Sequence, residues 1–169
     1  MADVHSKEQR SRNMAAIRGR DTTPEVEIRR RLHAKGFRYR LHRADLPGKP
    51  DIVLSSYSAL IMVNGCFWHW HGCSLCKVPG SRTEWWRRKL ARTVERDREI
   101  RRQLLDAGWR VCNVWECAFR GKGSRAEALD RTADRLAVWL RGTAGTLEIP
   151  RRPGGSSDRQ FMSRLESLR

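Results

Sequence analysis

The chain has 169 residues, of which 35 are Lys or Arg and 19 are Asp or Glu, so its formal net charge is +16. This length suits one folded domain of roughly 100–150 residues with tails, and no window approaches the ~20 apolar residues that a membrane helix needs. The positive charge is spread along the chain and predicts a phosphate-rich partner, because cationic side chains that neutralise phosphates release condensed counterions.

A solvated basic surface is the alternative explanation of this charge, and charge alone does not separate DNA from RNA. The N-terminus lacks the apolar segment of a signal peptide, so we expect a cytoplasmic protein with no membrane partner. In a reducing compartment, the five cysteines are expected to be metal ligands or core residues rather than disulfides.

A basic arm precedes the first well-marked helix. Within residues 1–20, Met14 and Ile17 lie about one helical turn apart and could form an apolar wedge. The helix predicted over 23–36 has threonine and proline at its start and glycine at its end, which are common start and stop signals.

Four strands and two more helices follow in chain order. The alternation of aromatic and basic residues over 37–41 is typical of an edge strand, and the apolar run over 59–63 predicts a strand buried on both faces. The remaining predicted elements are a strand over 52–54, a helix over 82–107, a strand over 109–115 and a helix over 125–141.

This order predicts an α/β domain over residues 21–141, with a mixed central sheet flanked by helices. Everything after Gly142 is rich in Gly, Pro, Ser and Arg. We therefore expect a flexible C-terminal tail over 142–169.

A nine-residue segment that starts at residue 65 combines metal ligands with large aromatic side chains. Cys66, His71 and Cys73 lie within eight residues, and zinc prefers a tetrahedral set of nitrogen and sulfur ligands. Either Cys76, by its zinc-knuckle spacing from Cys73, or Cys117, from a strand end, could supply the fourth ligand. Four protein ligands would make the zinc structural, because a catalytic zinc keeps an open position.

A second motif points to hydrolysis. Pro50-Asp51 precedes a strand, a turn and a second strand, which is how PD-(D/E)xK nucleases present a metal-binding aspartate. The usual acidic residue and lysine on the second strand are missing, since that strand ends Val63-Asn64, so Asp51 could be a turn residue. Phosphodiester hydrolysis needs a metal and a group that activates water. Asp51 and the nearby His69 meet these needs, although His69 could also be a zinc ligand or an ordinary loop histidine.

Two carboxylates on flanking helices could reach the same site. Glu25 stands three residues after Thr22, the spacing of a capping box, which would give it a structural role instead. Asp97 lies in the apolar stripe of the long helix, where a carboxylate needs a partner. A salt bridge to a local arginine is the alternative to a catalytic role for Asp97.

The aromatic residues of this region suggest contact with bases. Phe67, Trp68 and Trp70 cannot all be core in a loop that also holds metal ligands, and exposed aromatics in a basic protein offer stacking or wedging surfaces. Trp85 and Trp86 open the next helix, and at least one of them is expected to be core. The sequence indicates no role for Trp70.

Taken together, these motifs resemble the very-short-patch-repair (Vsr) endonucleases, bacterial enzymes that nick DNA at T:G mismatches left by deamination of 5-methylcytosine. The resemblance covers about residues 1–140. The matching motifs are Met1-Ala-Asp-Val-His, Arg12-Asn13-Met14, Leu46-Pro47-Gly48-Lys49-Pro50-Asp51, Gly65-Cys66-Phe67-Trp68-His69, Lys77-Val78-Pro79, Arg82-Thr83-Glu84, Asn113-Val114-Trp115-Glu116-Cys117 and Arg120-Gly121.

The resemblance implies a restriction-endonuclease-like, PD-(D/E)xK-type fold with a catalytic Mg²⁺. It implies that Asp51 and the main-chain carbonyl of Val63 hold this ion and that His69 activates water. Glu25 and Asp97 would support the reaction.

The resemblance also assigns a structural Zn²⁺ and the residues that enter the DNA. The zinc ligands it implies are Cys66, His71, Cys73 and Cys117. The implied intercalating residues are Phe67, Trp68 and Trp86, with Met14 entering from the other groove.

One departure from the family concerns Asn64, where the family pattern has a histidine. Asparagine can hydrogen-bond a phosphate but cannot transfer a proton, so the part of this position in the chemistry differs here.

We therefore expect a Mg²⁺-dependent, strand-specific endonuclease that nicks double-stranded DNA 5′ to the thymine of a T:G mismatch. It would act as a monomer on nucleoid DNA in the bacterial cytoplasm, and mismatch-repair proteins are possible further partners. The alternatives are a related nuclease of different specificity and a non-enzymatic, zinc-stabilised protein that binds mismatched DNA.

Overall fold

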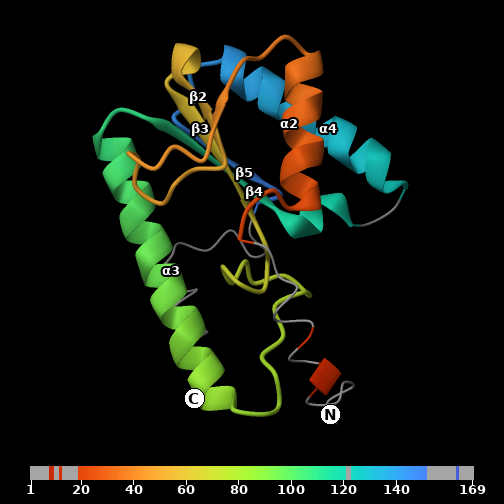
Figure 1. The fold of residues 1–169 in the computed structure, drawn as a ribbon, viewed down its shortest axis with the longest axis vertical. Helices are drawn as coiled ribbons and strands as arrows, with labels where there is room; N and C mark the ends of the chain where they lie inside the picture. The colour runs from red at the N-terminus through yellow and green to blue at the C-terminus, as the bar shows by residue number, and fades with distance from the viewer. Residues whose placement is uncertain (1–7, 10–11, 13–18, 121–122, 152–162, 164–169) are drawn as a thin grey trace.

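The computed structural model describes residues 8–9, 12, 19–120, 123–151 and 163. Two helices cover one face of a five-stranded sheet and one long helix lies on the other face (Figure 1). Met14 and Ile17 lie outside the described residues, so the predicted wedge on the N-terminal arm stays a prediction.

The elements follow the predicted order and add one strand at the end. The full helices are α2 (Thr23–Ala34), α3 (Thr83–Asp106) and α4 (Arg125–Arg141). The strands are β1 (Arg40–Leu41), β2 (Ile52–Leu54), β3 (Ala59–Asn64), β4 (Arg110–Trp115) and β5 (Thr146–Ile149), with short 3-10 turns η1 (Ser55–Tyr57) and η2 (Glu116–Phe119).

The sheet has the order β1-β2-β3-β4-β5 and is mixed, as predicted. β1, β2 and β3 pair antiparallel, whereas β3, β4 and β5 pair parallel. The connection between the parallel strands β3 and β4 contains α3. Parallel neighbours need such a long crossover, because a short turn cannot join them.

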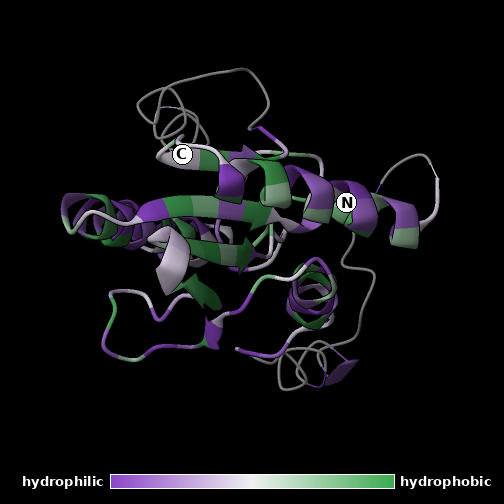
Figure 2. Cartoon of the chain, turned by 90° about the horizontal axis from the view of Figure 1, so that it is seen from above, coloured by the Kyte–Doolittle hydropathy of each residue, from purple (hydrophilic) through white to green (hydrophobic). Residues whose placement is uncertain are grey.

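Alternate residues of the strands pack against opposite helices. Ile52 and Ile61 belong to the core under α2 and α4, whereas Val53 and Leu60 belong to the core under α3. Figure 2 shows hydrophobic residues in the strands and mixed hydrophobic and hydrophilic sides on the helices. The prediction of burial on both faces is confirmed for Ala59–Ile61, while residues 62–64 are only half-buried at the end of β3.

The predicted flexible tail from residue 142 is wrong for β5. Ile149 is only 2% exposed and packs in the core. The Arg110 guanidinium fixes the turn into this strand by donating hydrogen bonds to the carbonyl oxygens of Trp139, Leu140 and Ala144. The folded domain therefore extends past residue 141. None of the helices in the described parts of the chain combines the length and apolar character of a membrane span.

Candidate active site and metal centre

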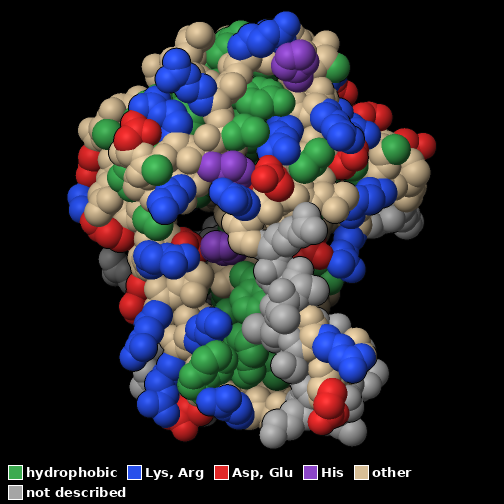
Figure 3. Space-filling view, in the orientation of Figure 1, with side chains coloured by type: hydrophobic (Ala, Val, Ile, Leu, Met, Phe, Trp, Pro, Cys, Tyr) green, Lys and Arg blue, Asp and Glu red, His purple; other side chains and the backbone are tan. Residues whose placement is uncertain are grey.

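A cleft of about 1450 Å³ opens at the end of β3. Lys and Arg side chains border a hollow on the corresponding face, with His side chains at its edge (Figure 3). The cleft brings together residues from α2, the β2–β3 pair, the following loop and α3. The residues predicted for catalysis and for binding magnesium all line it, namely Glu25, Asp51, Val63, Asn64, His69 and Asp97.

Asp51 stands immediately before β2 and faces β3. Its Oδ2 accepts a hydrogen bond from the backbone N–H of Val63 at 2.7 Å, and its side chain is only 20% exposed. Burial, with a smaller contribution from the nearby Glu25 carboxylate, raises the pKa of Asp51 to about 6. A bound cation would offset this cost of ionisation, and carboxylate oxygen is a ligand that Mg²⁺ prefers.

His69 and Asp97 form a close pair across the loop and α3. The His69 Nδ1 lies 2.5 Å from Asp97 Oδ2. If Nδ1 carries the proton that Asp97 accepts, Nε2 is left as the proton acceptor of the ring. Arg96 also lies 3.5 Å from the other Asp97 oxygen, so the salt bridge to a local arginine is present beside the contact with His69.

The two remaining polar residues of the set are held by hydrogen bonds. Glu25 is 4% exposed, and its oxygens accept from the Asp21 N–H at 2.8 Å and the Thr22 hydroxyl at 2.6 Å. This is not the reciprocal capping box considered as an alternative, because the Thr22 side chain caps no helix N–H. Asn64 donates to the side chain of Asn113 on the neighbouring strand at 3.4 Å.

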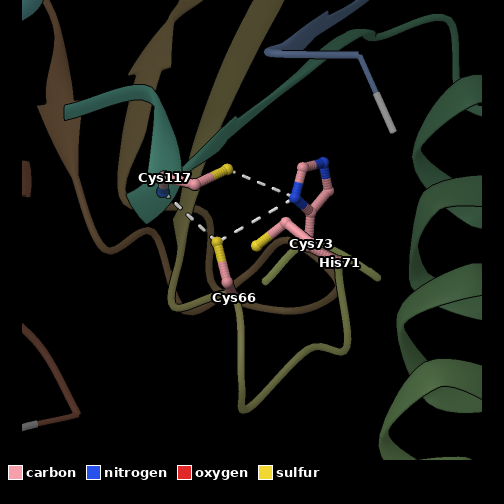
Figure 4. Close-up of side chains that lie close together, drawn as sticks. All are labelled: Cys66, His71, Cys73 and Cys117. Atoms are coloured by element: carbon pink, nitrogen blue, oxygen red, sulfur yellow. Dashed lines mark hydrogen bonds between the residues drawn. The ribbon is translucent and has the colours of Figure 1, made fainter. Parts of the chain in front are cut away.

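A second cluster joins the loop after β3 to the turn after β4 (Figure 4). The ligand atoms of Cys66, His71, Cys73 and Cys117 all lie within 4.8 Å of one another. Cys117 Sγ lies 3.3 Å and Cys66 Sγ 4.0 Å from His71 Nδ1. Three thiols and one imidazole make a donor set that fits a tetrahedral metal ion with no open position.

Cys76 lies outside this donor set, against the indication of its spacing from Cys73. Its Sγ donates to the Cys66 carbonyl oxygen at 3.0 Å and accepts from the Gly72 N–H at 3.2 Å. Cys76 therefore braces the loop. Burial raises the pKa of the Cys66 and Cys117 thiols, so their thiolates require a cation nearby.

The aromatic side chains gather beside the cleft. The ring centroids of Phe67, Trp68 and Trp86 lie 5.0–6.0 Å apart, and Trp68 also lines the cleft. Lys89 Nζ lies 5.6 Å from the Trp68 ring and 5.4 Å from the Trp86 ring. Trp85 is 44% exposed, so of the tryptophan pair that opens α3 it is Trp86 that is the more buried.

Trp70 has a structural role that the sequence did not indicate. It is 6% exposed and packs with Leu90 and Val94 of α3, and Phe67 packs against the same cluster. Its burial depends on α3 reaching beyond the sheet, which no local pattern predicts. Trp70 thus fixes the loop to α3.

Sequence reasoning also missed His42, which lines the cleft. The antiparallel pairing of Leu41 with Ile52 brings the next residue, His42, opposite Asp51. A tight turn between the two strands would have fixed their register and revealed this neighbour. The ten residues that separate them do not fix the register.

Comparison with known proteins finds relatives that are named as DNA endonucleases and nicking enzymes. A family model described as "DNA mismatch endonuclease Vsr" matches residues 2–75. The chain is 44% identical over 149 residues to the DNA mismatch endonuclease Vsr of Escherichia coli K12, covering 88% of this chain and 94% of that protein. It is 41% identical over 134 residues to the type II nicking enzyme V.XorIIP of Xanthomonas oryzae pv. oryzae, covering 79% and 98%. Its identity to the type II nicking enzyme V.NmeAIP of Neisseria meningitidis is 39% over 131 residues, covering 78% and 94%.

Proposed function

The chain belongs to the Vsr family of DNA mismatch endonucleases, and from that premise we propose that it is a Mg²⁺-dependent endonuclease that nicks double-stranded DNA 5′ to the thymine of a T:G mismatch. Such a nick would begin very-short-patch repair of deaminated 5-methylcytosine. The observation that carries the proposal is the cleft in which the buried Asp51 carboxylate and the His69–Asp97 pair meet.

In this proposal Asp51 and the main-chain carbonyl of Val63 hold Mg²⁺. When bound, the ion supplies positive charge that stabilises the phosphate during hydrolysis. The hydrogen bond from the Val63 N–H orients the Asp51 carboxylate, and the buried Glu25 adds negative charge next to it.

His69 would accept a proton from the attacking water at Nε2. Asp97 holds the ring through Nδ1, which selects the tautomer with a free Nε2. Asn64 lies at the open end of β3 and would donate a hydrogen bond to a phosphate oxygen. Its amide takes no part in proton transfer.

Zn²⁺ is the ion we propose for the cluster of Cys66, His71, Cys73 and Cys117, because zinc prefers this donor set and the set is complete without water. The role of this ion is structural. It would hold the aromatic loop against the end of β4.

Mismatch recognition would use the aromatic side chains beside the cleft. Phe67, Trp68 and Trp86 are proposed to enter the base stack, with Met14 and Ile17 of the N-terminal arm acting from the other groove. The contact of the aromatic rings with one another and of Trp68 with the cleft supports this, since recognition and hydrolysis must meet within a few bases.

We further propose a restriction-endonuclease-like, PD-(D/E)xK-type core, supported by the strand–turn–strand unit that carries Asp51 in a mixed sheet. Residues 1–20 would form the DNA-contacting arm and residues 21–151 the nuclease domain. We expect a monomer in the bacterial cytoplasm, with mismatch-repair proteins as possible partners.

The direct test uses a duplex with one T:G mismatch, labelled on the thymine strand, beside its T:A control. In Mg²⁺ we expect one nick, 5′ to the mispaired thymine, formed at least about tenfold faster than in the control. Denaturing electrophoresis reports both position and rate. Equal cleavage of the two duplexes contradicts the proposal, and preference for another mismatch would assign a related nuclease of different specificity.

Replacing Asp97 with Asn tests the role given to the His69 pair. The amide can donate to Nδ1 and thereby favour the wrong tautomer, so we expect kcat to fall by roughly 10²-fold or more with little change in DNA affinity. Single-turnover nicking and a binding assay in Ca²⁺ separate the two effects. Asp106→Asn is the matched control, because Asp106 lies exposed on α3 and pairs with Arg102; equal loss in both variants would refute the role.

A further inference from the structure

We infer that His42 is a positioning residue for nicking, which holds the Asp51 carboxylate in the orientation that receives the divalent cation. The inference rests on the proposed function and deepens it. It concerns a side chain that lines the same cleft and has no part in the proposal so far.

The sheet places His42 beside Asp51. β1 pairs antiparallel with β2 through Arg40 with Val53 and Leu41 with Ile52, so the next pair in the same register is His42 with Asp51. The backbone of His42 has a left-handed φ of 46°. This conformation is costly for a residue with a side chain and is typical of sites where the surrounding structure imposes it.

The His42 ring lies between two carboxylates. Its Nδ1 is 3.9 Å from Asp51 Oδ1, and its Nε2 is 3.5 Å from Asp21 Oδ1. Asp21 is itself held by Arg29, whose Nη1 lies 2.6 Å from the same oxygen. The ring is thus within ion-pair distance of both carboxylates, and Arg29 of α2 anchors the outer one.

The two oxygens of Asp51 thus have different partners. Oδ2 accepts from the Val63 N–H, while Oδ1 faces His42. A backbone hydrogen bond on one oxygen still permits the carboxylate to tilt about that contact. The ring on the other side limits this freedom, which is how outer partners tune the affinity of a ligating carboxylate.

The surroundings favour an orienting group at this position. Glu25 lies buried next to Asp51 and repels its negative charge. His42 is 24% exposed, and its Nδ1 approaches the Oδ1 of Asp51 at 3.9 Å. Without the ring, Asp51 would be free to turn away from Glu25 and from the cation position.

The test measures metal binding and nicking separately. Mn²⁺ binding to the zinc-loaded protein, followed by electron paramagnetic resonance without DNA, should weaken roughly tenfold in His42→Ala. The half-saturating Mg²⁺ concentration for nicking should rise by a similar factor, with little change in rate at saturating Mg²⁺. His42→Gln places an N–H donor in the same position and should stay within about threefold of wild type.

Two further variants keep the result interpretable. His33→Ala removes an imidazole that packs on Tyr39 and does not line the cleft, so it should leave Mn²⁺ binding unchanged. Asp21→Asn should weaken Mn²⁺ binding in the wild-type background and have no further effect in His42→Ala, because it acts through the ring. If the losses of Mn²⁺ affinity caused by Asp21→Asn and His42→Ala add up in the double variant, the inference is overturned.

The outcomes distinguish this inference from the proposed function. Mn²⁺ binding in His42→Ala equal to that of the wild type, or loss in His42→Gln as large as in His42→Ala, would overturn the role of His42. Absence of nicking by a wild-type protein that binds Mn²⁺ in a manner dependent on both Asp51 and His42 would count against the proposed function alone.

Discussion

Asp51→Asn is expected to lower the Mg²⁺-dependent nicking rate by at least roughly 10³-fold, because metal stabilisation of the phosphate is worth several kcal/mol and about 1.4 kcal/mol is a factor of ten in rate. Asparagine keeps an oxygen that can accept from the Val63 N–H, so the local structure is preserved. The effect therefore comes from the lost negative charge.

The same substitution should make the protein more stable at neutral pH in the absence of Mg²⁺. Burial raises the pKa of Asp51 to about 6, so the folded protein holds this proton more tightly than the unfolded chain does. Well below about pH 4 the carboxyl is protonated in both states and contributes no penalty. Between about pH 4 and pH 6 the unfolded chain loses this proton while the folded state keeps it, so the folded state loses stability, and the loss is complete above about pH 6. Asp51→Asn removes this cost, worth about 3 kcal/mol at pH 7.

Chemical denaturation of the zinc-loaded protein between pH 4 and pH 7.5 measures the difference. The advantage of Asp51→Asn should be small at the lower limit and complete at the upper one, and Mg²⁺ should reduce it by stabilising the wild type. Asp45→Asn, in an exposed pair with Arg43, is the control. An advantage that is independent of pH, or undiminished nicking by Asp51→Asn, would contradict the assignment.

Cys117→Ser is expected to abolish binding of the proposed zinc and to lower the free energy of unfolding by more than about 4 kcal/mol. Cys117 is the ligand that comes from the sheet side, whereas Cys66, His71 and Cys73 come from the loop. Loss of this ligand frees the segment that carries Phe67, Trp68 and His69. Mismatch binding and nicking should therefore decline together.

Metal analysis of the purified variant, denaturation and binding to the mismatched duplex in Ca²⁺ check these three consequences. Cys76→Ser is the matched control, because a serine hydroxyl can replace the two hydrogen bonds of a thiol that lies outside the donor set. We expect it to retain zinc and activity. A Cys117→Ser protein that keeps one zinc, or that loses nicking but not mismatch binding, would refute the proposed role of the metal.

Local patterns predicted most of the fold because they are strong here. The apolar run of β3, the Thr-Pro start of α2 and the long amphipathic α3 are local signals that indicate the type of element. β5 escaped prediction because only Leu147 and Ile149 supply its apolar face, within a segment otherwise rich in Gly and Arg. Its partner is a strand more than thirty residues away, and a parallel pairing leaves no turn signal.

The candidate site was predicted in part from spacing and in larger part from family resemblance. Spacing suggested Asp51 as a metal ligand, but it favoured Cys76 as strongly as Cys117, and only the fold brings Cys117 to the loop. Glu25 and Asp97 approach the cleft on two helices, α2 and α3, that lie far apart in the sequence. Tertiary contacts of this kind are not encoded in any local period, which also explains why His42 was missed.

The parallel pairing of β3 with β4 has a consequence for how the protein is assembled. Cys66 follows the end of β3, Cys117 follows the end of β4, and 51 positions separate them along the chain. A metal ion bound there would acquire its full set of ligands only after α3 has crossed over and the two strand ends have met. Metal binding would therefore report this step of folding, in which distant segments must close a long loop before they pair. With cobalt in place of zinc, visible absorption spectroscopy could follow the formation of this ligand set during folding.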